Sequence, residues 1–304
     1  MALHPDGHSK VKDRFRWPMS LAFVLVAGVI AIATLPSEDE TFENGDEELH
    51  IHDLVVDSTT NRVFVATHSG LFRIGRHSAR TAVIDASDDV TAFAISSYGR
   101  YFAGGHPDLS QAGRFRAPDK PPLLGLIASD DGGRTWKVAS LLGEADFHAL
   151  VVVGSYLFAA DSTSGRLLVS GDGGQVWEPR GSAELIDLAV DPRDVNRMVG
   201  VGLTKDFRQS LETSRDGGVT WREIDGPELV DVDWTLQEAF GITAAGAIWR
   251  SVDGLAWTEI GRAPGASQAI AVTESAMYVV GPEVDVSVSV DRGATWDSLK
   301  DSPT

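Results

Sequence analysis

Short apolar stretches separated by turn residues recur along the chain from about residue 50. Between residues 148 and 180 four of them follow one another, HALVVV, YLFAAD, GRLLVSGD and QVWEPR. Runs of this length, rich in β-branched and aromatic residues and bounded by turn residues, predict β-strands. Four strands with short connections predict one antiparallel sheet. The same template fits six segments, 50–85, 89–138, 148–180, 185–224, 230–260 and 267–299.

A motif of seven or eight residues recurs between the third and fourth predicted strands of five segments. Its copies are SDDGGRTW at 129–136, SGDGGQVW at 170–177, SRDGGVTW at 214–221, SVDGLAW at 251–257 and SVDRGATW at 289–296. Their serines are 41, 44, 37 and 38 residues apart. A period near 40 residues predicts a repeat architecture with one sheet in each repeat.

The residue types of this motif suit a tight turn between strands. The Asp can accept hydrogen bonds from backbone N–H groups of the turn, and the glycines supply positive φ. The tryptophan ring is large enough to pack between neighbouring sheets. We call the five copies the Ser-Asp-Trp turns, and we expect a structural role for Asp131, Trp136, Asp172, Trp177, Asp216, Trp221, Asp253, Trp257, Asp291 and Trp296.

The pattern S-x-D-x-G-x-T-W resembles the Asp-box, or BNR repeat, of sialidase-like and sortilin-like β-propellers. The phrases IHDLVVD, FVATHSGLF, GGHPDL and PLLGLIASDDGGRTW are similar to a group of bacterial membrane-anchored BNR proteins, often labelled glycosyl hydrolases. The resemblance implies an all-β, six-bladed propeller over residues 50–300. The motif marks a fold and not an activity, because unrelated functions share it.

The N-terminal part of the chain has a different pattern. Residues 17–36 carry no charge, and an uncharged segment of this length is long enough to span a bilayer as a helix. Basic residues dominate residues 1–16, and seven acidic residues fall within 37–49. We expect a cytoplasmic basic segment, a transmembrane anchor and an acidic linker, with the propeller extracytoplasmic. A signal peptide cleaved after Ala33, giving a secreted domain, is the alternative, since Ala31-Ile32-Ala33 fits the cleavage pattern.

Charge and composition narrow the classes of partner. Lys and Arg number 26 against 44 Asp and Glu, a net charge of −18, which disfavours nucleic acid as a partner. Contact with a membrane is then expected through the N-terminal helix alone. The absence of cysteine excludes disulfides, thiolate metal sites and cysteine nucleophiles.

Propeller topology predicts where a site forms. The start of the first strand and the end of the second strand of every sheet lie on one face, which we call the axial face. Five of the six histidines after residue 36 fall at these positions, and Asp89, Asp161 and Asp187 do as well. We predict a ligand-binding axial face built from His50, His52, His68, His106, His148, Asp161 and Asp187.

The nature of the ligand stays open at this stage. Each histidine taken singly can also serve as a local strand cap. Clustered neutral imidazoles with carboxylates suit zinc, copper or nickel, and we expect the five histidines as metal ligands. A small ligand, a glycan or a protein partner at the same face are the alternatives.

The resemblance also raises the possibility of an enzyme, which the residues do not favour. A sialidase mechanism needs three arginines on the substrate carboxylate and a tyrosine nucleophile. Arg73 in Phe72-Arg73-Ile74 superficially matches the start of the family, but it falls on a third strand, and no arginine occupies the predicted axial positions. The sequence therefore favours a binding function. A glycoside hydrolase acting on extracellular glycans is the alternative, and a protein-assembly scaffold is the second alternative.

The charge asymmetry around residues 17–36 generates a test of topology. A reporter enzyme fused after residue 49 should be exported, because positive flanking residues stay in the cytoplasm. Alkaline phosphatase activity with no β-galactosidase activity is the expected result. The reverse pattern would contradict the orientation.

Overall fold

A computed structural model describes residues 50–75, 80–84, 88–108, 115–182, 184–204, 206 and 208–299. The predicted basic segment 1–16, apolar segment 17–36 and acidic linker 37–49 lie outside the described residues. Within the described part of the chain, no helix has the length and apolar character needed to cross a membrane.

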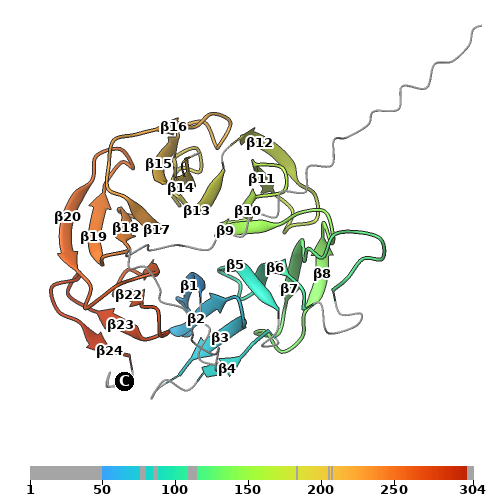
Figure 1. Ribbon diagram of the computed structural model, residues 1–304, viewed down its shortest axis with the longest axis horizontal. Helices are drawn as coiled ribbons and strands as arrows, with labels where there is room; N and C mark the ends of the chain where they lie inside the picture. The colour runs from blue at the N-terminus through green and yellow to red at the C-terminus, as the bar shows by residue number, and fades with distance from the viewer. Residues whose placement is uncertain are drawn as a thin grey trace, which may run out of the picture. The chain divides into compact units, whose positions relative to one another are not determined.

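In the described part of the chain, twenty-four strands form six four-stranded antiparallel sheets arranged around a common axis (Figure 1). In each sheet the strand order follows the chain, and the first strand lies nearest the axis. This arrangement confirms the prediction of an all-β, six-bladed propeller.

Each blade is built from one continuous segment of chain. Blade 1 consists of β1 Ile51–Asp57, β2 Arg62–Thr67, β3 Gly70–Ile74 and β4 Arg80–Ala82. Blade 2 consists of β5 Asp89–Ile95, β6 Tyr101–His106, β7 Leu126–Ser129 and β8 Lys137–Ser140. Blade 3 consists of β9 Phe147–Val153, β10 Tyr156–Asp161, β11 Arg166–Ser170 and β12 Glu178–Ser182.

Blades 4 to 6 repeat the same order of strands. Blade 4 consists of β13 Leu185–Val190, β14 Met198–Leu203, β15 Gln209–Ser214 and β16 Arg222–Glu223. Blade 5 consists of β17 Leu229–Trp234, β18 Ala239–Thr243, β19 Ala247–Ser251 and β20 Thr258–Arg262. Blade 6 consists of β21 Ala269–Val272, β22 Met277–Val280, β23 Val286–Ser289 and β24 Asp297–Ser298.

The fourth strand of the third blade begins later than the sequence predicted. We expected it over residues 175–180, whereas β12 spans Glu178–Ser182. The carboxylate of Asp172 accepts the backbone N–H groups of Gln175 and Val176, both at 3.0 Å. These bonds keep Gln175 and Val176 in the turn, so that the strand begins only after the tryptophan. In all five blades with a Ser-Asp-Trp turn, the last strand begins at the residue after the tryptophan.

Three hydrogen bonds of the Ser-Asp-Trp turns recur in every copy. In blade 4, Ser214 Oγ donates to Asp216 Oδ1 at 2.9 Å and accepts the N–H of Gly218 at 2.9 Å. The N–H of Thr220 donates to the same Asp216 oxygen at 2.9 Å. The corresponding bonds in the other blades join Ser129 to Asp131, Ser170 to Asp172, Ser251 to Asp253 and Ser289 to Asp291.

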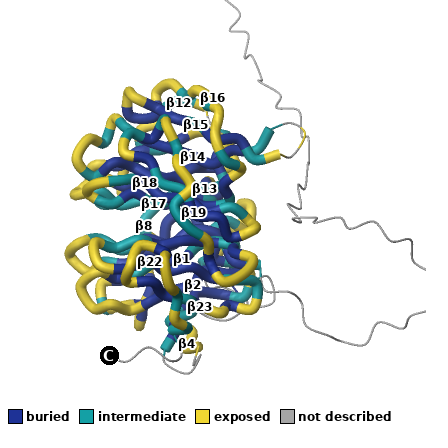
Figure 2. The backbone as a smooth tube through the Cα atoms, turned by 90° about the vertical axis from the view of Figure 1, so that its left-hand side faces the viewer, coloured by how far each residue is buried: buried dark blue, intermediate teal, exposed yellow. Residues whose placement is uncertain are grey.

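Six apolar clusters fill the six boundaries between neighbouring blades. The tryptophan of each Ser-Asp-Trp turn packs at the boundary with the preceding blade, and Trp136 is the most buried of the five. Buried residues lie mainly along the strands, and exposed residues lie mainly at the turns (Figure 2). The expected structural placement of the tryptophans is therefore observed.

The boundary between blades 6 and 1 closes the ring without a Ser-Asp-Trp turn. Its cluster includes Ile51 and Val65 of blade 1 and Ala269 and Val280 of blade 6, all nearly inaccessible to solvent. The N–H of Ile51 also donates to Gln268 Oε1 at 3.0 Å. Side-chain packing therefore joins the first blade to the last.

Close backbone contact between blades makes one glycine testable. A Cβ at Gly181 of β12 would lie 2.2 Å from the Val219 carbonyl oxygen in the turn of blade 4. Gly181→Ala should therefore lower the free energy of unfolding by about 1–3 kcal/mol, because backbone must shift. The measurement is the unfolding midpoint, which should fall by about 2 °C or more.

Gly171→Ala is the matched control in the same blade. A Cβ there meets only the Tyr156 ring at 3.5 Å, an ordinary contact, and the other Ser-Asp-Trp turns carry side chains at this position. Its unfolding midpoint should stay within error or rise slightly. Equal destabilisation by the two changes would contradict the proposed clash.

Candidate functional site

Three histidines lie together at one end of the first blade. His50 precedes β1, His52 lies within β1, and His68 follows the end of β2. Because the two strands are antiparallel, these ends share one edge, and the His68 N–H donates to the His50 carbonyl at 3.3 Å. The ring centroids are 4.9 Å apart for His50 and His52, 5.0 Å for His50 and His68, and 4.4 Å for His52 and His68.

A β-bulge sets the position of His52. Ile51 pairs with Thr67 and Asp53 pairs with Ala66, so that His52 is an extra residue in β1. A bulge changes the direction of a side chain relative to regular alternation and is common next to functional sites. The first strands of four other blades are bulged at the corresponding place, where the extra residues are Thr91, His148, Ile186 and Val230.

Asp89, the first residue of β5 in blade 2, joins the histidines of blade 1. Its Oδ1 lies 3.1 Å from His52 Nε2 and 3.0 Å from His68 Nδ1. The two nitrogens are 3.1 Å apart. We call His52, His68 and Asp89 the His-His-Asp triad. The side chain of His52 is 15% exposed and that of His68 is 50% exposed, so the triad is accessible from one side.

A chain of alternating carboxylates and imidazoles leads from the triad into blade 3. His106 Nδ1 lies 3.3 Å from Asp89 Oδ2, and His106 Nε2 lies 3.3 Å from Asp146 Oδ1. The other oxygen of Asp146 lies 3.2 Å from His148 Nε2. Both ring nitrogens of His106 thus face carboxylates. The structure brings together all five predicted histidines, with His106 and His148 placed against Asp89 and Asp146.

The protonation states differ sharply within this group. Burial, with repulsion from His52 and His68, lowers the pKa of His50 to about 4. Burial also lowers the pKa of His52, despite its hydrogen bond to Asp89. The hydrogen bonds to Asp146 and Asp89 instead raise the pKa of His106 to about 10. At neutral pH the first two rings are neutral, and His106 is an imidazolium.

The two carboxylates are ionised. Burial by itself raises the pKa of Asp89, but hydrogen bonds from His106, His52 and His68 outweigh it and hold the pKa well below its usual range. Burial opposes ionisation of Asp146 in the same way, and hydrogen bonds from His106 and His148 again hold the pKa well below its usual range.

Asp161 lies beside this group in a supporting position. Its Oδ1 accepts the N–H of Asp146 at 2.9 Å, and its Oδ2 accepts the Ser164 hydroxyl at 2.6 Å. The carboxylate therefore closes the turn after β10 and fixes the backbone that carries Asp146. These contacts give Asp161 a positioning role.

Asp187 lies on β13 of blade 4, and its Oδ2 accepts the N–H of Val232 in blade 5 at 2.6 Å. Burial raises its pKa to about 6. Asp53, Asp231 and Asp233 likewise accept N–H groups from the first strand of the next blade. These four aspartates line a cavity of about 400 Å³ between the first strands. We call them the inter-blade aspartates, since they join blades 1 to 2, 4 to 5 and 5 to 6.

The four tyrosines lie near the starts of second strands, away from the triad. Tyr101 and Tyr156 are the first residues of β6 and β10, Tyr278 is the second residue of β22, and Tyr98 lies in the turn before β6. Arg73 lies within β3. Among the described residues, none of the four tyrosines lies at the axial face, whereas Arg166 pairs in register with Asp161 at the end of β10 on that face.

Comparison with models of known protein families finds no match, and comparison with curated protein sequences finds none either. A chain of the nidogen–laminin complex is 11% identical, over 75% of this chain and 89% of that chain, with a TM-score of 0.57. A gluconolactonase from Xanthomonas campestris is 12% identical, over 78% and 85%, with a TM-score of 0.58. YCF48 bound to a D1 peptide is 16% identical, over 84% and 83%, with a TM-score of 0.51. These similarities establish a shared propeller fold.

The His106 contacts predict an unusual titration. In protein freed of metal by a chelator, His106 should stay protonated through pH 8, because two carboxylates stabilise its cation. Its stabilising contribution is complete below the unfolded pKa near 6.5 and is lost as pH rises towards about 10. NMR titration of the imidazole carbon-bound protons, assigned with His106→Gln, measures this.

Asp146→Asn should lower the pKa of His106, because it removes one of the two charges. Asp194→Asn is the control, since Asp194 lies in an exposed turn of blade 4 and bonds only to Asn196 and its own turn. A His106 pKa near 6.5 in the parent protein would contradict the assignment.

Proposed function

We propose that this propeller binds a borderline transition-metal ion, such as zinc, copper or nickel, through the His-His-Asp triad. The observation that carries the proposal is the mutual separation of three donor atoms, 3.0–3.1 Å for each pair. Metal–ligand bonds of about 2.0–2.1 Å in a tetrahedral zinc site place ligand atoms about 3.3 Å apart. The triad is close to that spacing.

Hydrogen bonding alone does not satisfy this triangle of atoms. A neutral imidazole nitrogen either carries a proton or accepts one. If His52 Nε2 and His68 Nδ1 both donate to Asp89, their two protons face each other across 3.1 Å. If one of them does not donate, one contact to the carboxylate has no proton. A cation is compatible with all three lone pairs at once.

The chemistry of the donors favours borderline metals. Imidazole nitrogen suits zinc, copper and nickel, whereas calcium and magnesium prefer sets of oxygen ligands. Burial keeps His52 neutral, which is the form that donates a lone pair. The exposed side of His68 leaves room for a further ligand, such as a small molecule or a partner side chain.

His106 and Asp146 support the triad in this proposal. Carboxylate ligands are oriented by hydrogen bonds from outside the metal site, and such bonds affect metal affinity. His106 holds the second oxygen of Asp89, and Asp146 holds the far side of His106. The geometry thus supports two ligands among the five predicted histidines and a positioning role for His106.

The proposed location of this activity is extracytoplasmic. The support comes from the sequence, where basic residues precede an uncharged segment of bilayer length and acidic residues follow it. A membrane anchor would hold the metal-binding propeller at the cell surface.

Calorimetric titration of zinc, copper and nickel tests the proposal on the untagged full-length chain, dialysed against chelator. The wild type should bind one ion of at least one of these metals, and His68→Gln should weaken binding by more than about tenfold. His68 is half-exposed, so its replacement should leave the fold intact. The affinity for the metal should decrease as the pH is lowered, because protons compete with the metal for the same lone pairs.

His148→Gln is the matched control, because it removes a histidine of the same face that contacts Asp146 and not the triad. It should retain the affinity of the wild type. Equal affinity in wild type and His68→Gln, with melting curves unchanged, would contradict the triad as the metal site.

A further inference from the structure

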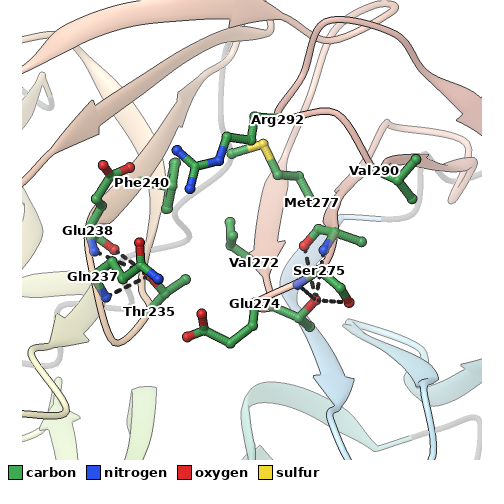
Figure 3. A pocket seen from close by; sticks show the side chains of 12 residues that line it. Thr235, Gln237, Glu238, Phe240, Val272, Glu274, Ser275, Met277, Val290 and Arg292 are labelled. Atoms are coloured by element: carbon green, nitrogen blue, oxygen red, sulfur yellow. Dashed lines mark hydrogen bonds between the residues drawn. The ribbon is translucent and has the colours of Figure 1, made fainter.

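A second cavity lies between blades 5 and 6, where the turns that follow the first strands meet the Ser-Asp-Trp turn of blade 6. It has a volume of about 130 Å³. The β17–β18 turn contributes Gln237, the β21–β22 turn contributes Glu274, and the blade 6 turn contributes Arg292 (Figure 3). These turns lie at the opposite ends of the strands from the His-His-Asp triad.

Arg292 occupies a strained backbone position. Its φ is +60°, and the residues at the same position of the other full-length turns are Gly132, Gly173 and Gly217, with φ between +71° and +79°. A residue with a Cβ adopts this conformation at an energetic cost, because its Cβ approaches the following carbonyl oxygen. Such strain is found preferentially at functional sites. The turn itself forms without an arginine, as the other copies show.

The guanidinium of Arg292 forms no hydrogen bond or ion pair with any residue in the described part of the chain. Figure 3 shows it directed across the cavity, towards the side on which Phe240 and Glu238 lie. An arginine that is free of partners and aimed into a cavity is suited to a carboxylate, which it can hold through two parallel hydrogen bonds.

A carboxylate with a free oxygen lies in the same cavity. Glu274 Oε1 accepts the N–H of Leu236 at 3.4 Å, which ties its side chain to the β17–β18 turn. Its carboxylate is directed into the cavity, towards Thr235 and Gln237 (Figure 3). Glu238 adds further negative charge: its Oε1 pairs with Arg250 at 2.8 Å, while its buried Oε2 has no hydrogen-bond partner.

The remaining wall of the cavity is apolar. Phe240, Val272 and Met277 line it beside the charged groups. The cavity therefore presents one cation, carboxylates across from it, and an apolar surface, in a volume that suits a molecule of few heavy atoms. We infer that this cavity binds a small zwitterion, namely an α-amino acid with a short apolar side chain. Arg292 holds its carboxylate, Glu274 its ammonium group, and the apolar wall its side chain.

Calorimetric titration of the full-length chain with alanine, valine and leucine tests the inference. At least one should bind to the wild type, and Arg292→Gly should weaken that binding by at least about tenfold, because a charge-assisted bidentate contact is lost. Arg292→Gly installs the residue of the other turns and relieves the strain, so its unfolding midpoint should rise. Loss of binding then cannot result from unfolding.

Further ligands and a control variant complete the test. Isobutyric acid and isobutylamine, which each lack one charged group of valine, should bind at least about tenfold more weakly than valine. Arg134→Ala, at an exposed arginine in the Ser-Asp-Trp turn of blade 2, should leave binding unchanged. Absence of binding by all three amino acids, or equal binding by Arg292→Gly, would overturn the inference. Equal binding of isobutyric acid would overturn the zwitterion in favour of a simple carboxylate. None of these outcomes depends on metal.

Discussion

Hydrogen-bonded strand pairing stops at every blade boundary, so the ring depends on side chains packed between sheets. Each of the six sheets is complete in itself, and the six apolar clusters lie between them. The Ser-Asp-Trp turns add a tryptophan to five of these boundaries, and the inter-blade aspartates add hydrogen bonds at three. A single blade is therefore only weakly stable, and the free energy of folding comes mainly from the contacts between neighbouring blades around the closed ring.

The histidine-rich site follows from the same boundaries. Asp89 of blade 2 meets His52 and His68 of blade 1, and His106 of blade 2 meets Asp146 of blade 3. No single blade holds a complete triad. Phe93 and Phe147 are fully buried in the apolar clusters on either side of blade 2, so the blades that contribute these side chains pack against one another through those clusters.

The fold could be predicted because the repeats are short and their turns carry residues with fixed roles. Topology then placed His50, His52 and His68 at one end of one blade without any knowledge of distances. The bulge at His52 could not be predicted, because it depends on the register between two strands. Asp146 was missed because it precedes its strand, although its spacing of two residues from His148 repeats that of His50 and His52.

For other residues, the contacts in the structure differ from what the sequence predicted. Asp187 was expected at the axial face as a ligand-binding residue, whereas its carboxylate accepts a backbone N–H of blade 5. Only the neighbouring strand, more than forty residues further on, makes this contact visible. Arg292 stands in the sequence where three other Ser-Asp-Trp turns have glycine, but the cavity beside it depends on the packing of blades 5 and 6 and could not be predicted.

One feature of the chain order has a mechanical consequence. β1 is the first strand of the propeller and also the innermost strand of blade 1, and the described chain begins with His50, Ile51 and His52. A pull on the chain before residue 50 therefore acts first on these two rings and on Ile51, which belongs to the apolar cluster between blades 6 and 1. The ladder between β1 and β2 and the bond from Ile51 to Gln268 resist that pull directly. Tension along the polypeptide and the spacing of the imidazoles are thereby coupled through a single strand.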